Sequence, residues 1–173
     1  METKTLIIYQ SGKQHTQKIA KVIAAELKCE ALDINTITDT NKPNLEQYDI
    51  VGIGSGIYAW SFGRKLKKWL KKYQWSSKEV CKPDVFLFST AGGSSNGSQR
   101  RMSSFLQKKC GITTVTGWSC TAKMVDNADA LINLKEWINH KLKPTNPEPV
   151  GGTVSCGCAP VESEKPKTTT PKK

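Results

Sequence analysis

The residues best suited to bind a ligand lie near the start of the chain, in the segment Ser11-Gly12-Lys13-Gln14-His15-Thr16. A short apolar run, Leu6 to Tyr9, precedes this segment, and an amphipathic helical pattern follows it directly. A helix that begins just after a strand has backbone N–H groups without partners, and its dipole adds partial positive charge there. Ser11 and Thr16 add hydroxyl groups, and Lys13 adds a formal charge. The segment therefore predicts a phosphate site, and the alternative is that Ser11 and Thr16 only cap the helix.

The other titratable and nucleophilic side chains do not form a catalytic set. His15 fits a loop or capping role, and His140 fits the last turn of a helix, where a cation suits the dipole. Four cysteines are scattered singly, at positions 29, 81, 110 and 120, and are expected to be reduced thiols. Cys156 and Cys158 form an unexplained pair without further metal ligands nearby. We therefore predict no catalytic side chain and no metal site.

Strand and helix patterns alternate along most of the chain, and this alternation predicts how the loops are positioned. Apolar strands are expected at residues 6–9, 30–34, 50–54, 85–88 and 113–116, and four amphipathic helices alternate with them. Such a pattern predicts an α/β fold with a doubly wound, five-stranded parallel sheet between two helical layers. Open sheets of this kind bind ligands beyond the carboxyl ends of their strands. Those ends are residues 11–16, 55–60, 89–98 and 117–123, all rich in Gly, Ser and Thr.

Length and composition indicate one domain, residues 1–143, followed by a disordered tail rich in Pro, Thr and Lys, residues 144–173. The start of the chain fits a first strand better than a signal peptide, and no apolar run is long enough for stable membrane insertion, so a cytoplasmic protein is expected. The net charge is +11, and it comes mostly from lysine, with three arginines. Because no nucleic-acid-binding module accompanies this charge, nucleic acid is not an expected partner. The charge instead favours acidic or anionic partners, although a merely solubilising surface would look similar.

Three segments resemble the flavodoxin-like family, and the resemblance extends over about residues 3–142. The loop at residues 11–16 is similar to the family's loop for the FMN phosphate: Ser11 and Thr16 match, while Lys13 and Gln14 replace the usual Thr and Gly. The runs YDIVGIGSGIYAW (Tyr48 to Trp60) and VFLFSTAGG (Val85 to Gly93) resemble the two strands and loops that flank the flavin ring. The resemblance implies the strand order 2-1-3-4-5.

The resemblance also implies a bound FMN and the residues that hold it. Its phosphate would lie on the loop from Ser11 to Thr16, which also contains Gly12, Lys13, Gln14 and His15. The ring would lie between two sets of residues: Ser55, Gly56, Ile57, Tyr58 and Trp60 on one side, and Ser89, Thr90, Ala91, Gly92 and Gly93 on the other. Tyr58 or Trp60 would stack on the ring, with Trp118 as a competitor for that role. Cys120 would lie at the rim, where a small buried thiol is the expected state.

The implied function is that of a small electron-transfer flavoprotein. An FMN-dependent oxidoreductase stays open as an alternative, of either the flavodoxin-like protoporphyrinogen oxidase or the NAD(P)H:quinone reductase type. The extra loop of the former is missing here. A third possibility is a module that has kept the fold and lost FMN, which Lys13 and Gln14 would explain. The positive charge predicts a higher flavin reduction potential than in acidic flavodoxins, and an acidic redox partner that is ferredoxin-like or a reductase.

Overall fold

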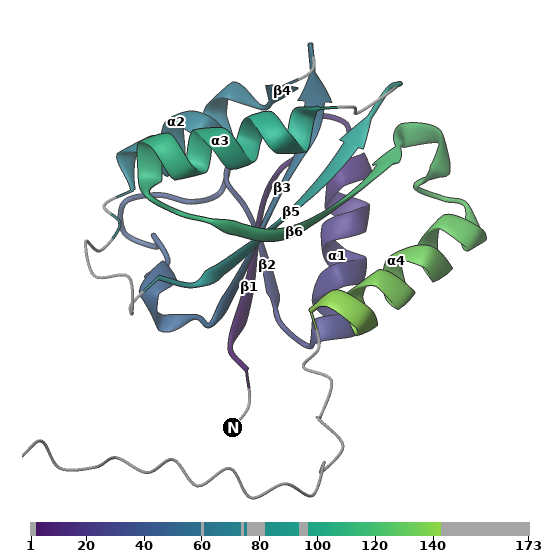
Figure 1. The fold of residues 1–173 in the computed structure, drawn as a ribbon, viewed down its shortest axis with the longest axis horizontal. Coiled ribbons are helices and arrows are strands. Elements are labelled where there is room, and N and C mark those ends of the chain that lie inside the picture. Colours follow the sequence, from purple (N-terminus) through teal and green to yellow (C-terminus); the bar gives the residue numbers. More distant parts are fainter. Residues whose placement is uncertain (1–2, 60, 74, 76–81, 94–96, 143–173) are drawn as a thin grey trace, which may run out of the picture.

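Six strands and four α-helices alternate along the chain in the computed structural model, which describes residues 3–59, 61–73, 75, 82–93 and 97–142 (Figure 1). The strands are β1 (Thr5–Gln10), β2 (Glu30–Asp33), β3 (Ile50–Tyr58), β4 (Ser61–Phe62), β5 (Asp84–Ala91) and β6 (Thr114–Thr121). The helices are α1 (His15–Leu27), α2 (Arg64–Lys72), α3 (Ser98–Cys110) and α4 (Ala128–Lys141), with short 3-10 turns η1 (Leu45–Gln47) and η3 (Ala122–Met124).

Five of the strands form a parallel sheet in the order β2-β1-β3-β5-β6, which confirms the expected doubly wound α/β architecture and strand order. The register places Leu6 of β1 beside Val51 of β3, and Val51 beside Val85 of β5. The central strands are apolar runs of buried residues, as expected for parallel strands covered on both faces. Strand β4 was not expected; it pairs antiparallel with the end of β3 through Ile57–Phe62 and Tyr58–Ser61.

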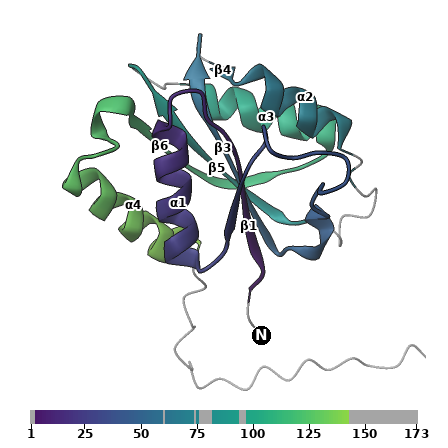
Figure 2. The same cartoon turned by 180° about the vertical axis from the view of Figure 1, so that it is seen from behind.

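Two helices cover each face of the sheet, and both views of the ribbon show the same arrangement (Figures 1 and 2). On one face, the α1 residues Ile19 and Ile23 pack with Leu134 and Ile138 of α4 against Phe86 and its neighbours. On the other face, Leu66 and Leu70 of α2 pack with Met102 and Leu106 of α3. These residues recur at helical spacing, so each helix buries one apolar stripe and leaves its other side to solvent.

The strands continue further at their carboxyl ends than the sequence indicated. Strand β3 ends at Tyr58 instead of Gly54, β5 at Ala91 instead of Phe88, and β6 at Thr121 instead of residue 116. Most of the extra residues are Gly, Ser and Thr, which are typical of loops but here pair in register, with Ser55 beside Ser89 and Gly56 beside Thr90. Pairing with neighbours on both sides therefore overrides the weak strand preference of Gly and Ser. The expected tail, residues 144–173, lies outside the described residues, so the domain boundary at 143 stays a prediction.

Candidate functional site

The loop between β1 and α1 leads directly into the first turn of the helix. Helix α1 begins at His15, and Gln14 before it has a φ of 56°, in the left-handed region that favours glycine. No side chain caps this helix, and no acidic residue lies in its first turn. The start of α1 thus keeps the partial positive charge of its dipole uncompensated, which is the condition for binding an anion.

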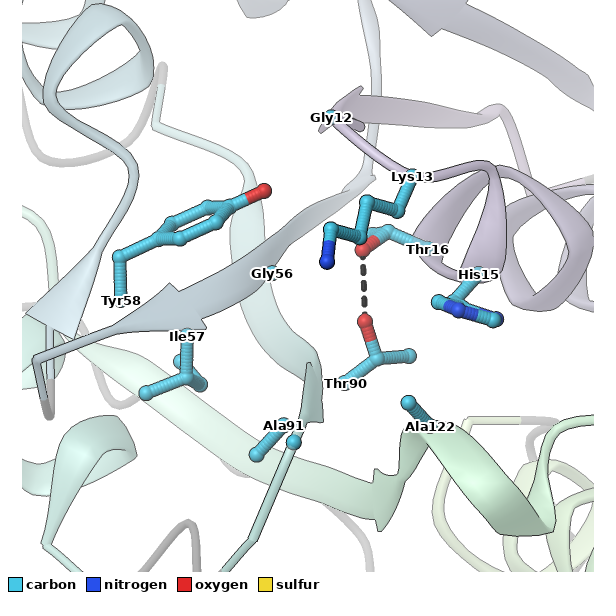
Figure 3. Close-up of a pocket in the computed structure, with 11 residues that line it drawn as sticks. Gly12, Lys13, His15, Thr16, Gly56, Ile57, Tyr58, Thr90, Ala91 and Ala122 are labelled. Atoms are coloured by element: carbon cyan, nitrogen blue, oxygen red, sulfur yellow. Dashed lines mark hydrogen bonds between the residues drawn. The ribbon is translucent and has the colours of Figure 1, made fainter.

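A cavity of about 290 Å³ lies beside this loop, close to the lower end of the range typical for small-molecule sites. Figure 3 shows that its wall comes from the start of α1, the ends of β3 and β5, and η3. The lining residues are Gly12, Lys13, His15, Thr16, Gly56, Ile57, Tyr58, Thr90, Ala91, Gly92 and Ala122. The Lys13 side chain extends into the cavity, which places a cation beside the start of α1 (Figure 3). Three segments that the sequence identified separately therefore meet around one space.

A buried hydrogen bond between two threonines joins α1 to β5 at the wall of the cavity. The hydroxyl oxygens of Thr16 and Thr90 lie 2.7 Å apart, and both side chains are almost completely buried. Either hydroxyl can donate to the other, and the one that accepts keeps its own proton for a further acceptor. The capping role considered for Thr16 is therefore not what the structure shows. The pair fixes the helix start and still offers one hydroxyl proton to a ligand.

Two buried polar atoms at the start of α1 have no hydrogen-bond partner among the described residues: Ser11 Oγ and His15 Nδ1. Buried polar atoms in folded proteins nearly always have a partner, and an unsatisfied one costs about 1–3 kcal/mol. Both belong to the segment expected to hold a phosphate, and phosphate oxygens accept hydrogen bonds from hydroxyl and imidazole groups. These residues therefore fit a phosphate-bearing ligand.

Tyr58 covers the loop from the opposite side of the cavity. Its ring is about half exposed, at 48%, and its hydroxyl faces Gly12 (Figure 3). A Cβ atom on Gly12 would lie 2.5 Å from Tyr58 Oη, so only glycine allows this approach. Trp60, the other expected stacking residue, lies outside the described residues. Tyr58 is therefore the described aromatic side chain placed to contact a flat ligand.

Several expected binding residues do not line the cavity. Ser55 is fully buried on the α2 side of the sheet, where its hydroxyl accepts from the Gly63 amide at 2.9 Å and donates to the Gly56 carbonyl at 2.8 Å. Ser89 is also fully buried, and its Oγ has no partner within the described residues. Neither these serines nor Ser11, Gln14 and Gly93 line the cavity. Their assignment as binding residues stays a prediction.

Two residues near the site were missed by sequence reasoning. Ala122 completes the cavity wall from η3, and Gln10 at the end of β1 accepts a hydrogen bond from the Leu66 amide at 2.9 Å through its side-chain oxygen. Gln10, which belongs to β1, thereby caps the start of α2. The segment 117–123 was recognised as a strand end, which is the signal that could have pointed to Ala122. The sequence contains no comparable signal for Gln10, because the contact spans 56 positions.

Trp118 cannot take the stacking role for which it was considered. It lies within β6, is 8% exposed, and its indole N–H donates to Asn133 of α4 at 3.3 Å. Cys120, two residues on, is buried in the same core, and burial raises the pKa of its thiol to about 11. Its thiol is therefore protonated at neutral pH, as expected for a structural cysteine. His140 lies in the last turn of α4, also as expected.

Two negative findings apply to the part of the chain that the structure describes. Within those ranges, no three His, Cys, Asp or Glu residues gather closely enough to hold a metal ion. In the same residues, every helix is too short or too polar to cross a membrane.

Comparison with known proteins identifies the family. Among curated proteins, an uncharacterised protein of Methanocaldococcus jannaschii is 40% identical over 90 residues, which cover 51% of this chain and 55% of that protein. The chain thus spans about half the length of this relative. The oxidised flavodoxin 1 of Bacillus cereus superposes with a TM-score of 0.57 at 15% identity, covering 78% of this chain and 94% of that one.

A flavoprotein of Lactobacillus acidophilus in complex with FMN gives a TM-score of 0.51 at 22% identity, covering 73% of this chain and 99% of that one. At such identities these two solved structures show a common fold. In sequence, residues 6–117, well over half of the chain, match the family described as the flavodoxin domain. The chain therefore belongs to the flavodoxin family.

Proposed function

We propose that this protein binds FMN and acts as an electron-transfer flavoprotein. The observation that supports the proposal most is the start of α1, which is uncapped, has buried Ser11 and His15 atoms without partners, and adjoins a cavity with a lysine in it. The Lactobacillus acidophilus flavoprotein that shares this fold was solved in complex with FMN. Family membership and the local chemistry therefore favour the same ligand.

In this proposal the loop at residues 11–16 holds the phosphate. The amides of the first turn, the Ser11 hydroxyl and the His15 ring would donate hydrogen bonds to phosphate oxygens. Lys13 would neutralise part of the phosphate charge, and one hydroxyl of the Thr16–Thr90 pair would donate its free proton. The departure from the family pattern at Lys13 then strengthens anion binding instead of abolishing it.

The other end of the cavity would hold the flat ring. Tyr58 offers an aromatic face, and the space beside Gly92 is open, since a Cβ atom added there would meet no atom within 4 Å. FMN, when bound, supplies one- and two-electron redox chemistry. The residues of this chain would bind it, orient it and exclude water from one side.

We prefer the carrier role, which needs no side chain to act as an acid, a base or a nucleophile. The FMN-dependent oxidoreductase and the FMN-free module stay as alternatives. The residue that favours the FMN-free module is Gln14, whose left-handed backbone occupies the position where the family pattern has glycine. The net charge of +11 favours an acidic redox partner. A cytoplasmic location is part of the same proposal.

The absorption spectrum of the freshly purified protein tests the proposal. We expect the near-ultraviolet and blue absorption bands of an oxidised flavin. After denaturation, the protein should release FMN and not FAD. Oxidation of NADH or NADPH by the purified protein with a quinone acceptor would favour the oxidoreductase alternative. A colourless protein that fails to quench FMN fluorescence would favour the FMN-free module and contradict the proposal.

A further inference from the structure

The two helices on one face of the sheet carry a dense positive charge. Helix α2 has six lysine and arginine side chains and no carboxylate, and α3 has four and no carboxylate. On the opposite face, α1 and α4 together have four lysines and three carboxylates. The excess charge of the folded chain therefore gathers on one side, which we call the basic layer: the cationic side chains of Arg64–Lys72 and Ser98–Cys110.

The arginines of the basic layer are placed against the helix dipole. Arg64 is the first residue of α2, while Arg100 and Arg101 lie in the first turn of α3, and neither first turn contains an acidic residue. A cation at the positive end of a helix is unfavourable by about 0.3–1 kcal/mol. Helices α2 and α3 follow β4 and β5 in the chain, so their first turns, with these three arginines, lie at the carboxyl edge of the parallel sheet, where the cavity is also located.

The surface of the basic layer is mostly cationic, and its two aromatic side chains, Trp69 and Phe105, are partly buried against the core beneath it. Leu66, Leu70, Met102 and Leu106 are buried beneath it, and none of the large apolar residues that the described structure exposes belongs to α2 or α3. Insertion into a bilayer interface requires exposed apolar side chains, and binding of single-stranded nucleic acid uses exposed aromatic ones. A surface of hydrated carboxylates needs neither, so it complements this layer best.

We propose that the basic layer is a docking surface for an acidic redox protein, which it brings to the edge of the sheet beside the cavity. This inference rests on the proposed electron-transfer function, because that function requires a protein partner close to the flavin. The new element is the face of the molecule that the partner contacts. The opposite face, α1 and α4, has nearly balanced charge and is not part of the docking surface.

The test measures binding, which does not depend on flavin chemistry. The full-length ¹⁵N-labelled protein, supplemented with FMN, is titrated with an acidic [2Fe–2S] ferredoxin at low salt, and amide shifts are followed by NMR. The charge-reversed pair Lys68→Glu/Lys71→Glu is compared with Lys21→Glu/Lys135→Glu on the other face; all four lysines are exposed. Because both pairs change the net charge equally, they separate a local surface from a general attraction.

We expect shifts confined to α2, α3 and the β3–β4 edge, and affinity that falls at least about tenfold at high salt. Lys68→Glu/Lys71→Glu should weaken binding about tenfold, and the control pair less than about twofold. If the Lys68→Glu/Lys71→Glu variant does not fold, the Lys68→Gln/Lys71→Gln variant replaces it. Its affinity for the ferredoxin should also fall. Equal loss in both pairs, or shifts on α1 and α4, would overturn the inference.

Two further arms compare other polyanions under the same conditions. Tighter binding of duplex DNA or of phosphatidylserine vesicles than of the ferredoxin, lost in Lys68→Glu/Lys71→Glu, would assign the layer to those ligands and contradict an acidic protein partner. A colourless protein that still binds ferredoxin through α2 and α3 would support the docking surface and contradict only the proposed function. A yellow protein that does not bind ferredoxin would support the proposed flavin-binding function and contradict the docking surface.

Discussion

Helices α1 and α4 lie side by side on the same face of the sheet, yet their first turns are built in opposite ways. The side chain of Asn127 caps α4 by accepting from the amides of Asp129 at 2.8 Å and Ala130 at 3.3 Å, and Asp129 adds a negative charge. Helix α1 has no capping side chain and no acid in its first turn, and a lysine lies in the loop before it. The start of α4 is satisfied within the chain, whereas the start of α1 has no such internal cap.

This difference teaches that helix starts in this fold serve two purposes. The start of α2 resembles that of α4, since Gln10 accepts from the Leu66 amide and Ser55 accepts from the Gly63 amide. Capped starts contribute to folding stability, typically about 1 kcal/mol each. The uncapped start of α1 gives up that stability, and in return keeps amides and partial charge available for a ligand. The two kinds of start should therefore respond differently to mutation.

The largest effect is expected from Lys13→Glu, which reverses the charge beside the uncapped start. Placing a carboxylate next to the ligand phosphate should raise the dissociation constant of FMN about a hundredfold at low salt. The measurement is quenching of FMN fluorescence. Lys21→Glu, on an exposed part of α1 outside the cavity, is the control and should change the constant less than about twofold. Similar losses in both variants would mean that Lys13 acts only through net charge.

Ser11→Ala removes a buried hydroxyl that has no partner in the described structure. The free energy of unfolding of the apoprotein should stay the same or rise slightly, since no internal hydrogen bond is lost. The affinity for FMN should fall about tenfold, equivalent to about 1.4 kcal/mol. Urea unfolding and FMN titration measure the two quantities separately. A destabilised apoprotein with unchanged affinity would show that Ser11 has a purely structural role.

Asn127→Ala is the opposite case, at the capped start. Loss of the two hydrogen bonds to the amides of α4 should lower the free energy of unfolding by about 1 kcal/mol. The dissociation constant of FMN should not change, because Asn127 does not line the cavity. If FMN binding weakened as strongly as in Ser11→Ala, the distinction between the two helix starts would fail.

The smallest effect is expected from Gln14→Gly. Its φ of 56° is unfavourable for a residue with a side chain, so glycine should raise the free energy of unfolding by about 0.5–1 kcal/mol. Lys28→Gly is the matched control, because Lys28 ends α1 with a φ of 52°. Both variants should gain similar stability in urea unfolding, and only Gln14→Gly should alter FMN affinity. Loss of stability in Gln14→Gly would show that its side chain contributes more than the strain costs.

Much of the fold could be predicted because apolar runs and helical spacing reflect burial directly. Strand β1 and the stripe of Ile19 and Ile23 follow this logic. The carboxyl ends of the strands could not be placed, since Gly and Ser have weak strand preference on their own and are held here by pairing across the sheet. Strand β4 has only two residues, Ser61 and Phe62, and forms no pattern at all.

The meeting of three separate segments around one cavity could be predicted because parallel strands end at one edge. What could not be predicted are the contacts between distant residues. Thr16 meets Thr90 across 74 positions, and Trp118 contacts Asn133 of α4, which packs on the same face of the sheet. These contacts make Thr16, the alternative helix cap, part of the cavity wall, and Trp118, the alternative stacking residue, part of the core. Such roles depend on tertiary packing, which local composition does not encode.

The amide shifts of the ¹⁵N-labelled protein during titration with FMN test the central claim most directly. If the uncapped start of α1 holds the phosphate, the largest shifts should occur at residues 11–17, with further changes at residues 56–58 and 90–92. The amides of Asp129 and Ala130 at the capped start of α4 should not move. Absence of any shift at residues 11–17, or equal shifts at the start of α4, would contradict the account.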